Sequence, residues 1–161
     1  SHLQKILIEK KMENNSKTLK INFSSRKPRL LTVLSPYYED IGKNLLKGSS
    51  EVLGQYNIKA DVINVPGAFE IPTAIFLKKD YYDGFIALGC VIRGETSHYD
   101  TVCNVSAHFL SKLGLQGICI GNGILNCENY TQAIERSDPN KQNKGGNAAI
   151  AALSLVSLKQ S

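Results

Sequence analysis

The feature that most constrains the fold is a regular alternation of short apolar runs with longer segments of helical periodicity. Four runs have the length and composition of strands, and they span residues 29–34, 58–65, 84–92 and 117–125. Each is followed by a segment in which apolar residues recur every three or four positions, as in an amphipathic helix. This alternation predicts a parallel sheet, because parallel neighbours need a crossover connection and a helix supplies it.

The helices are predicted over residues 40–56, 68–79, 98–114, 128–137 and 143–160. Pro72 is tolerated only in the first turn of its helix. In the third helix the buried stripe is expected to hold Val102, Cys103, Phe109, Leu110 and Leu113. The run at 84–92 is apolar almost throughout, which indicates a strand covered on both faces. We therefore predict a three-layer α/β/α fold, with a parallel four-stranded sheet and helices on both faces.

In open parallel sheets, ligands bind outside the carboxyl ends of the strands. The strand exits here read "SPYYED", "VPGAFE", "CVIRGETSH" and "GNGILN". They are expected to meet along one edge of the sheet, and this rule locates the candidate site before any motif does.

The net charge of +5 is unevenly distributed. Residues 1–29 hold eight Lys or Arg and two Glu, whereas the rest of the chain holds 11 Lys or Arg and 12 Asp or Glu. We therefore divide the chain into a polar, basic segment at 1–28 and a folded domain at 29–161. A nearly neutral body without an aromatic-basic motif argues against nucleic-acid recognition.

The four cysteines indicate a reducing compartment. They form no C-x-x-C pair and no cluster with zinc-ligand spacing, so we expect free thiols, a cytoplasmic location and no metal. No apolar run approaches the roughly 20 residues that span a membrane, and the N-terminal residues lack the pattern of a secretory signal. The sequence thus predicts no membrane partner.

The third exit, "RGETSH", combines several groups suited to an anion. Thr96 or Ser97 is expected to cap the following helix, whose free amides and dipole attract negative charge. Gly94 lets the backbone approach a ligand, and His98 can move protons near neutral pH. A capped helix with a surface histidine is the alternative interpretation.

The other exits add further candidates. In "VPGAFEIP", the turn is expected to expose the backbone of Ala68 and Phe69 with the Glu70 carboxylate, although Glu70 could simply balance the helix dipole. Tyr37 could stack on a flat heterocycle or pack on its own chain. Arg136 offers a planar fork for phosphate, or is an exposed residue at a helix end.

The motifs "VPGAFEIP", "ALGCVIRGETSHYD", "QAIERS" and "NKGGNAA", in this order, resemble the lumazine synthase family. The resemblance runs from about residue 29 to 159. It implies a flavodoxin-like fold and a reaction that joins 5-amino-6-(D-ribitylamino)uracil to 3,4-dihydroxy-2-butanone 4-phosphate. The products are 6,7-dimethyl-8-ribityllumazine, phosphate and water, and no cofactor takes part.

The resemblance also implies a role for each site residue. His98 is the general acid/base; Glu95, Thr96 and Arg136 bind phosphate, with Lys144 near by. The residues assigned to the pyrimidine and its ribityl chain are Tyr37, Ala68, Phe69, Glu70, Cys90, Val91, Ile92 and Asn122. Asn122 departs from the family pattern, because many relatives carry an aromatic residue there. Glu95 replaces a small neutral residue, so we expect its carboxylate to point away from phosphate and its N–H to bind.

Family members assemble as homopentamers, and some form 60-subunit icosahedral shells. The resemblance implies a site shared by two subunits, with riboflavin synthase as a candidate partner. The sequence leaves pentamer and shell open, and residues 19–23 are expected to add an edge strand to a neighbour. A non-catalytic flavodoxin-like module that binds flavin or phosphate remains the alternative function.

Overall fold

The computed structural model describes residues 2–7, 21–23, 26–95 and 97–161. Residues 2–7 are helical, and the remaining elements follow the predicted alternation. They are β1 (Leu30–Leu34), α2 (Glu39–Gln55), β2 (Asp61–Asn64), the 3₁₀ turn η1 (Ala68–Glu70), α3 (Ile71–Lys78), β3 (Gly84–Ile92), α4 (Tyr99–Leu115), β4 (Cys119–Cys127), α5 (Tyr130–Ser137) and α6 (Lys144–Gln160). Pro72 lies at the start of α3, as predicted.

The four strands form one parallel sheet in the order β2-β1-β3-β4. This confirms the predicted fold class. Three strands differ in extent from the prediction. β1 begins one residue later, and β2 is shorter at both ends. β4 begins and ends two residues later, because the chain leaves α4 through Gly117, which has a φ of 86°.

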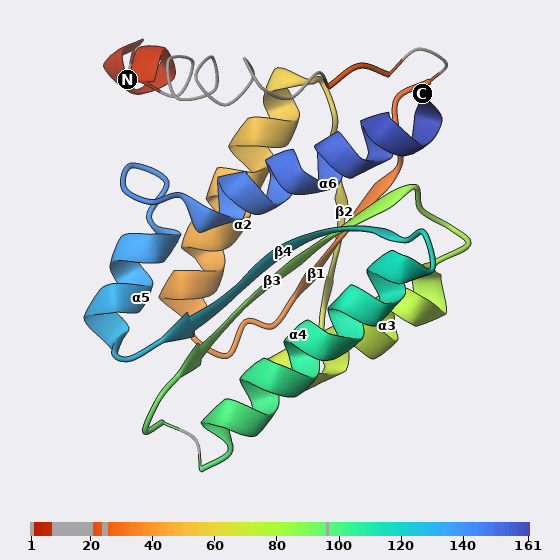
Figure 1. The fold of residues 1–161 in the computed structure, drawn as a ribbon. Coiled ribbons are helices and arrows are strands. Elements are labelled where there is room, and N and C mark those ends of the chain that lie inside the picture. The colour runs from red at the N-terminus through yellow and green to blue at the C-terminus, as the bar shows by residue number, and fades with distance from the viewer. Residues whose placement is uncertain (1, 8–20, 24–25, 96) are drawn as a thin grey trace.

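Helices cover both faces of the sheet (Figure 1). One layer contains α2, α5 and α6, and the other contains α3 and α4. The strands send alternate side chains into the two layers, as a two-residue period requires. On β3, Ile86 and Leu88 face the first layer, whereas Phe85 and Ala87 face the second.

The buried stripe of α4 differs from the predicted one. Cys103, Ser106, Leu110 and Leu113 are buried, whereas Phe109 is 47% exposed. The stripe follows positions three or four residues apart, and Phe109 lies one residue beside it. Placing Phe109 in the core was therefore wrong.

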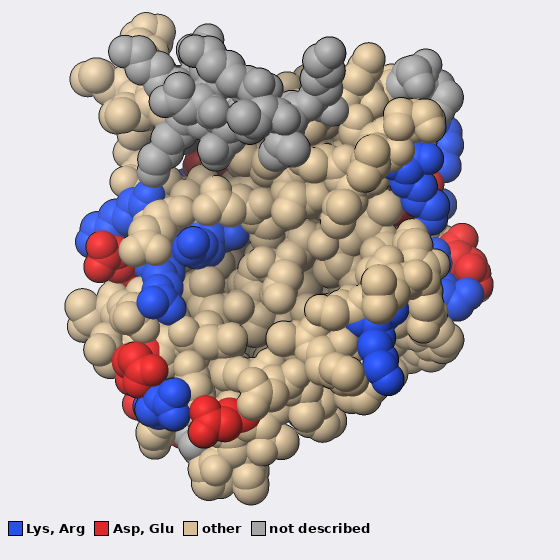
Figure 2. Space-filling model, viewed as in Figure 1, with Lys and Arg blue, Asp and Glu red and all other residues tan. Residues whose placement is uncertain are grey.

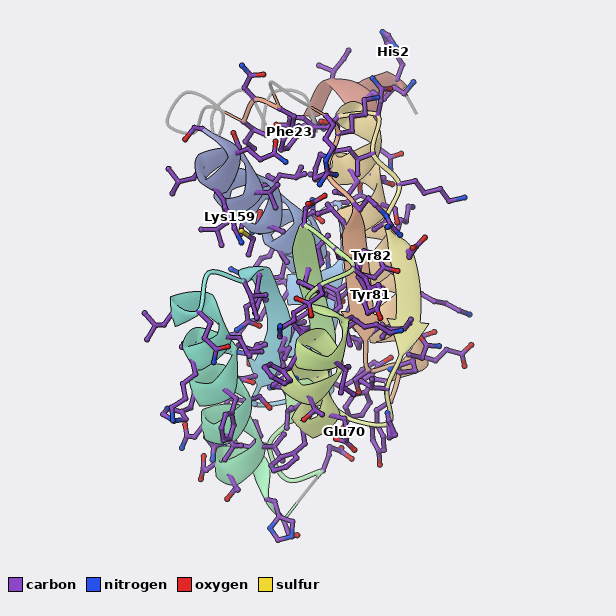
Figure 3. The ribbon with its side chains drawn as sticks, turned by 90° about the vertical axis from the view of Figure 1, so that its right-hand side faces the viewer. His2, Phe23, Glu70, Tyr81, Tyr82 and Lys159 are labelled. Carbon is purple, nitrogen blue, oxygen red and sulfur yellow. The ribbon has the colours of Figure 1, made fainter. Side chains whose placement is uncertain are left out.

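Residues 21–23 pack on α6 of the same chain. The Asn22 N–H donates to the Ser157 hydroxyl at 2.9 Å, and this hydroxyl donates to the Asn22 carbonyl at 3.0 Å. Phe23 lies at the end of the molecule opposite Glu70 (Figure 3). These three residues are not in a strand, and residues 19 and 20 lie outside the described part of the chain, so the predicted edge strand remains a prediction.

Within the described ranges, none of the helices combines the length and apolar character needed to cross a bilayer.

Candidate active site

The exits of the four strands meet at one edge of the sheet. After β1, the Ser35 N–H donates to the Leu88 carbonyl at 2.9 Å, and the turn after β2 is tied to the end of β1 by a similar bond. After β3, the Arg93 N–H donates to the Cys127 carbonyl at 2.8 Å. This edge lies at the lower left of Figure 1, where α4 and α5 begin. The predicted convergence is confirmed.

The first exit presents an open aromatic ring. Tyr37 is 73% exposed, and its ring meets that of Tyr38 edge-on at 5.0 Å between centroids. An exposed ring held from one side is suited to stack on a flat heterocycle. Burial raises the pKa of Tyr38, and the Glu95 carboxylate and Cys90 thiol add to the shift. The exits of β1 and β3 therefore face each other.

The second exit forms the short η1 turn. Phe69 and Glu70 are exposed, and Figure 3 shows Glu70 at the lower end of the molecule. Ala68 is buried, and its carbonyl accepts a hydrogen bond from the Ser106 hydroxyl at 3.3 Å. The expectation of an exposed Ala68 backbone was wrong, because a serine on α4 packs over this turn. Glu70 keeps its carboxylate available to hydroxyl groups.

The third exit offers backbone groups rather than side chains. Val91 and Ile92 are buried, and Cys90 is half-buried. β3 pairs with β4 as far as Ile92 but with β1 only as far as Leu88. Because backbone groups alternate along a strand, those of Cys90 and Ile92 face the side that β1 has left, whereas those of Val91 face β4. Cys90 and Ile92 are thus placed to bond a planar ring edge, and Val91 is not.

The turn from β3 to α4 carries the predicted anion site. Gly94 adopts a φ of 84°, a conformation that glycine reaches without strain. The helix begins at Tyr99 with His98 as the N-cap residue, and no side chain caps it. The expectation that Ser97 caps the helix was wrong, and Thr96 lies outside the described residues. His98 is exposed at the positive end of α4.

Glu95 lies in the turn that follows β3. Its side chain is exposed, and its charge contributes to the raised pKa of Tyr38 at the first exit. Its N–H donates to the Ile92 carbonyl at 3.2 Å. The expected bond from this N–H to phosphate stays a prediction.

The fourth exit lines a polar cavity. Asn122, Arg136 and Lys144 are among the residues around a space of about 420 Å³ between β4 and the α5–α6 segment. The Arg136 Nη1 donates to the Asn126 carbonyl at 2.9 Å, which directs the guanidinium along the end of β4. Asn122 folds back, and its side-chain oxygen accepts the Ile124 N–H at 3.0 Å. These groups form a basic recess that suits a phosphate.

Two thiols lie beneath this recess. Cys127 is fully buried, and Arg136 Nη1 lies 3.9 Å from its sulfur. A hydrogen bond from Cys90, together with the charge of Arg136, outweighs the effect of burial and lowers the pKa of Cys127 to about 7. All four cysteines are free thiols, as predicted. No group of three His, Cys, Asp or Glu side chains able to hold a metal occurs within the described ranges.

The predicted residues fall into two groups within one chain. Tyr37, Glu70, Cys90 and His98 surround the exits of β1 to β3. Arg136 belongs to the cavity at β4, and His98 is not among the residues that line it. The helices that carry them, α4 and α5, cover opposite faces of the sheet. Among the described residues, His98 and Arg136 therefore lie over opposite faces of the sheet, and His98 does not line the cavity at β4.

One cluster at this edge had no role predicted from the sequence; it is formed by Arg93, Tyr99, Asp100 and Glu128. Arg93 Nε lies 2.9 Å from a Glu128 oxygen, and its guanidinium carbon lies 4.3 Å from the centre of the Tyr99 ring. The only available signal was an arginine directly after a buried strand.

The fold and the site define an open parallel α/β domain with anion-binding groups at the carboxyl edge of its sheet. The sequence model for 6,7-dimethyl-8-ribityllumazine synthase matches residues 27–160. The chain belongs to this family.

Individual relatives agree with the family match. A 6,7-dimethyl-8-ribityllumazine synthase from Jannaschia sp. (strain CCS1) is 48% identical over 135 residues, covering 83% of this chain and 76% of the relative. The protein of the same name from Zymomonas mobilis is 44% identical, covering 82% of this chain and 96% of the relative. That from Bartonella tribocorum is 48% identical, covering 84% and 92%.

Proposed function

We propose that this chain is a transferase of riboflavin biosynthesis. It condenses 5-amino-6-(D-ribitylamino)uracil with 3,4-dihydroxy-2-butanone 4-phosphate to give 6,7-dimethyl-8-ribityllumazine, phosphate and water. The observation that carries the proposal is the family match over residues 27–160, which includes every candidate residue at the four strand exits. The relatives named above carry the same activity in their names.

The pyrimidine substrate binds at the exits of β1 to β3. Tyr37 stacks on its ring, and the backbone of Cys90 and Ile92 bonds its edge, on the side where β3 has no strand partner. Phe69 and the Glu70 carboxylate hold the ribityl chain. Charged acceptors bind hydroxyl groups strongly, which favours a polyol chain over an apolar one.

The butanone phosphate binds between a helix start and an arginine. The phosphate is held by the N-terminal turn of α4, by Thr96, which precedes that helix in the sequence, and by Arg136 with Lys144 near by. An amine of the pyrimidine attacks the ketone, and the carbinolamine loses water to give an imine. Phosphate is then eliminated, and the second amine closes the ring with loss of a second water. His98 moves protons in these steps, and cationic groups stabilise the departing phosphate.

A site of this kind is completed by a second copy of the chain. His98 of one subunit and Arg136 of its neighbour then face the same phosphate.

Two surfaces support self-association into a homopentamer. Phe69, Phe76 and Phe109 border an apolar groove of about 370 Å³ between α3 and α4. Figure 2 shows a broad area without charged residues on the face where β4 forms the sheet edge. Icosahedral packing of pentamers and binding of riboflavin synthase are further steps of the same proposal, and the free thiols suit the cytoplasm.

A mixing assay tests the function. The protein is expected to release inorganic phosphate and to form the fluorescent lumazine only when both substrates are present. A flavodoxin-like binding module would bind a ligand without releasing phosphate. Absence of both signals from the assembled protein would exclude the proposed reaction.

His98→Ala tests the proton-transfer role. Turnover is expected to fall by roughly 10²–10⁴, the range usual for loss of a general acid/base, while the dissociation constant of the pyrimidine changes little. Unchanged turnover would remove His98 from the mechanism.

A further inference from the structure

Arg93 directly follows β3, at the point where the end of β3 is bonded to the end of β4. Its backbone N–H donates to the carbonyl of Cys127, the last residue of β4, at 2.8 Å. It is followed by residues 94–98, the turn that carries His98. The backbone of Arg93 is therefore fixed to the sheet, and its side chain can extend toward the starts of α4 and α5.

The guanidinium contacts three partners, two at the start of α4 and one in the turn between β4 and α5. Nε donates to a Glu128 carboxylate oxygen at 2.9 Å, and Nη1 donates to Asp100 at 3.4 Å. The guanidinium carbon lies 4.3 Å from the centre of the Tyr99 ring. Tyr99 and Asp100 are the first two residues of α4, so these contacts fix the backbone directly after His98.

Glu128, at the other end of the contact with Arg93, is also held in place. The Glu128 N–H donates to the Gln132 side chain at 2.8 Å, and the Gln132 N–H donates to the Asn129 side chain at 2.8 Å. Asn129 is the N-cap residue of α5, the helix that carries Arg136. Arg93 thus joins the start of α4 to the start of α5.

The contacts that Arg93 makes are better suited to positioning than to stability. Its side chain is 49% exposed and that of Glu128 is 58% exposed, and exposed ion pairs contribute little to global stability. A planar guanidinium can serve two carboxylates and stack on a ring at once, which a lysine ammonium cannot do. Between Arg93 and Tyr99 the turn passes through Gly94 at positive φ, where glycine restricts the backbone least.

We propose that Arg93 is a positioning residue, which holds the turn at 94–98 and the start of α4 so that His98 faces the reacting atoms. The proposal rests on the proposed function, since it needs His98 to act on the substrate. Arg93 itself does not touch the substrate and exchanges no proton with it.

The test compares Arg93→Lys with wild type in the assembled enzyme. Turnover is expected to fall by about 10- to 100-fold, as small misplacements of a catalytic group produce. The KM for the pyrimidine and the unfolding midpoint are expected to change little. Arg26→Lys is the matched control, because Arg26 makes a two-nitrogen contact to Asp83 away from the site; its turnover is expected to equal wild type.

A double variant separates positioning from a general structural role. If Arg93 acts through His98, the Arg93→Lys/His98→Ala protein should be no slower than His98→Ala alone, because the two losses are not additive. Glu128→Gln removes the carboxylate that Arg93 Nε contacts and keeps the arginine. This variant should also have slower turnover, and its loss should likewise not add to that of His98→Ala. If the Arg93→Lys protein does not fold, Glu128→Gln takes its place in the test.

The outcomes separate this inference from the proposed function. If the wild-type protein turns over both substrates and the Arg93→Lys variant is equally fast, the role of Arg93 is overturned and the proposed function is not. Additive losses in the double variant also overturn it, since they place Arg93 outside the action of His98. Absence of turnover in wild type removes the proposed function and this inference together.

Discussion

At Asp83, burial and charge act on one carboxyl group in opposite directions. Burial alone raises its pKa, but the Arg26 guanidinium, at 2.8 Å from both carboxylate oxygens, and the Arg29 N–H at 2.7 Å outweigh it. The pKa in the folded protein therefore lies below its usual value. A carboxyl with a lowered folded pKa stabilises the protein above its unfolded pKa, and this contribution is lost as the pH falls through the folded pKa.

Asp83→Asn is expected to lower the free energy of unfolding at pH 7 by at most about 1 kcal/mol, because Arg26 is exposed and water screens the pair. As the pH falls below about 4 and through the lowered folded pKa, the wild-type carboxyl becomes protonated, so the difference between the two proteins should shrink. Urea unfolding at pH 7 and pH 3 measures this.

Asp80→Asn is the matched control for this experiment, since the Asp80 side chain is 80% exposed and pairs with the adjacent Lys79. It should show no comparable dependence on pH. An Asp83→Asn difference that is as large at pH 3 as at pH 7 would contradict the electrostatic explanation.

Single residues were predictable where the backbone alone determines their role. Pro72 had to begin a helix, and the strand-exit rule placed Tyr37 in the segment between β1 and α2. The role of Arg93 was not predictable, because its partners Asp100 and Glu128 lie seven and 35 residues away along the chain. Contacts of this kind depend on the tertiary structure and leave no periodic pattern.

At the scale of elements, α6 packs on the sheet at unusually short range. A Cβ atom added at Gly121 on β4 would collide with the backbone carbonyl of Ala148 on α6. Glycine is thus needed here for close approach and not for an unusual backbone angle. This contact fixes the distance between α6 and the cavity that holds Arg136.

Gly121→Ala is expected to lower the free energy of unfolding by about 1–3 kcal/mol, because backbone atoms would have to move. Gly54→Ala is the matched control, since a Cβ there meets nothing within 4 Å and the residue lies in α2. It should stabilise the protein by about 0.5–1 kcal/mol. Equal effects of the two substitutions in urea unfolding would argue against the close contact.

Helix boundaries and helix faces were harder to predict than the order of the elements. Ser97 is a good capping residue, yet α4 starts after His98, because the turn through Gly94 sets where helical geometry begins. Phe109 matched the hydrophobic count of α4 but borders the α3–α4 groove instead. A large hydrophobic side chain tends to be buried, and it can be buried against another element of the same chain or against another molecule.

At the scale of the whole molecule, the two candidate groups His98 and Arg136 lie in different layers of one chain. His98 directly precedes α4 on one face of the sheet, and Arg136 lies on α5 over the other. One sequence supplies both groups, and under the proposed function a ring of identical subunits joins each His98 to the Arg136 of a neighbour. The fold could be predicted from one chain, whereas the proposed shared site depends on an assembly of several chains.

Mixing two inactive variants tests the shared site. His98→Ala and Arg136→Ala are each expected to have low activity, because each damages every site in its own assembly. When the two proteins are unfolded together at equal concentration and refolded, subunits should mix at random. About one quarter of the interfaces then pair an intact His98 with an intact Arg136 if they come from different subunits. Phosphate release should therefore rise toward about a quarter of wild type. If both groups acted within one chain, no intact site would form, and the activity would remain the mean of the two separate variants.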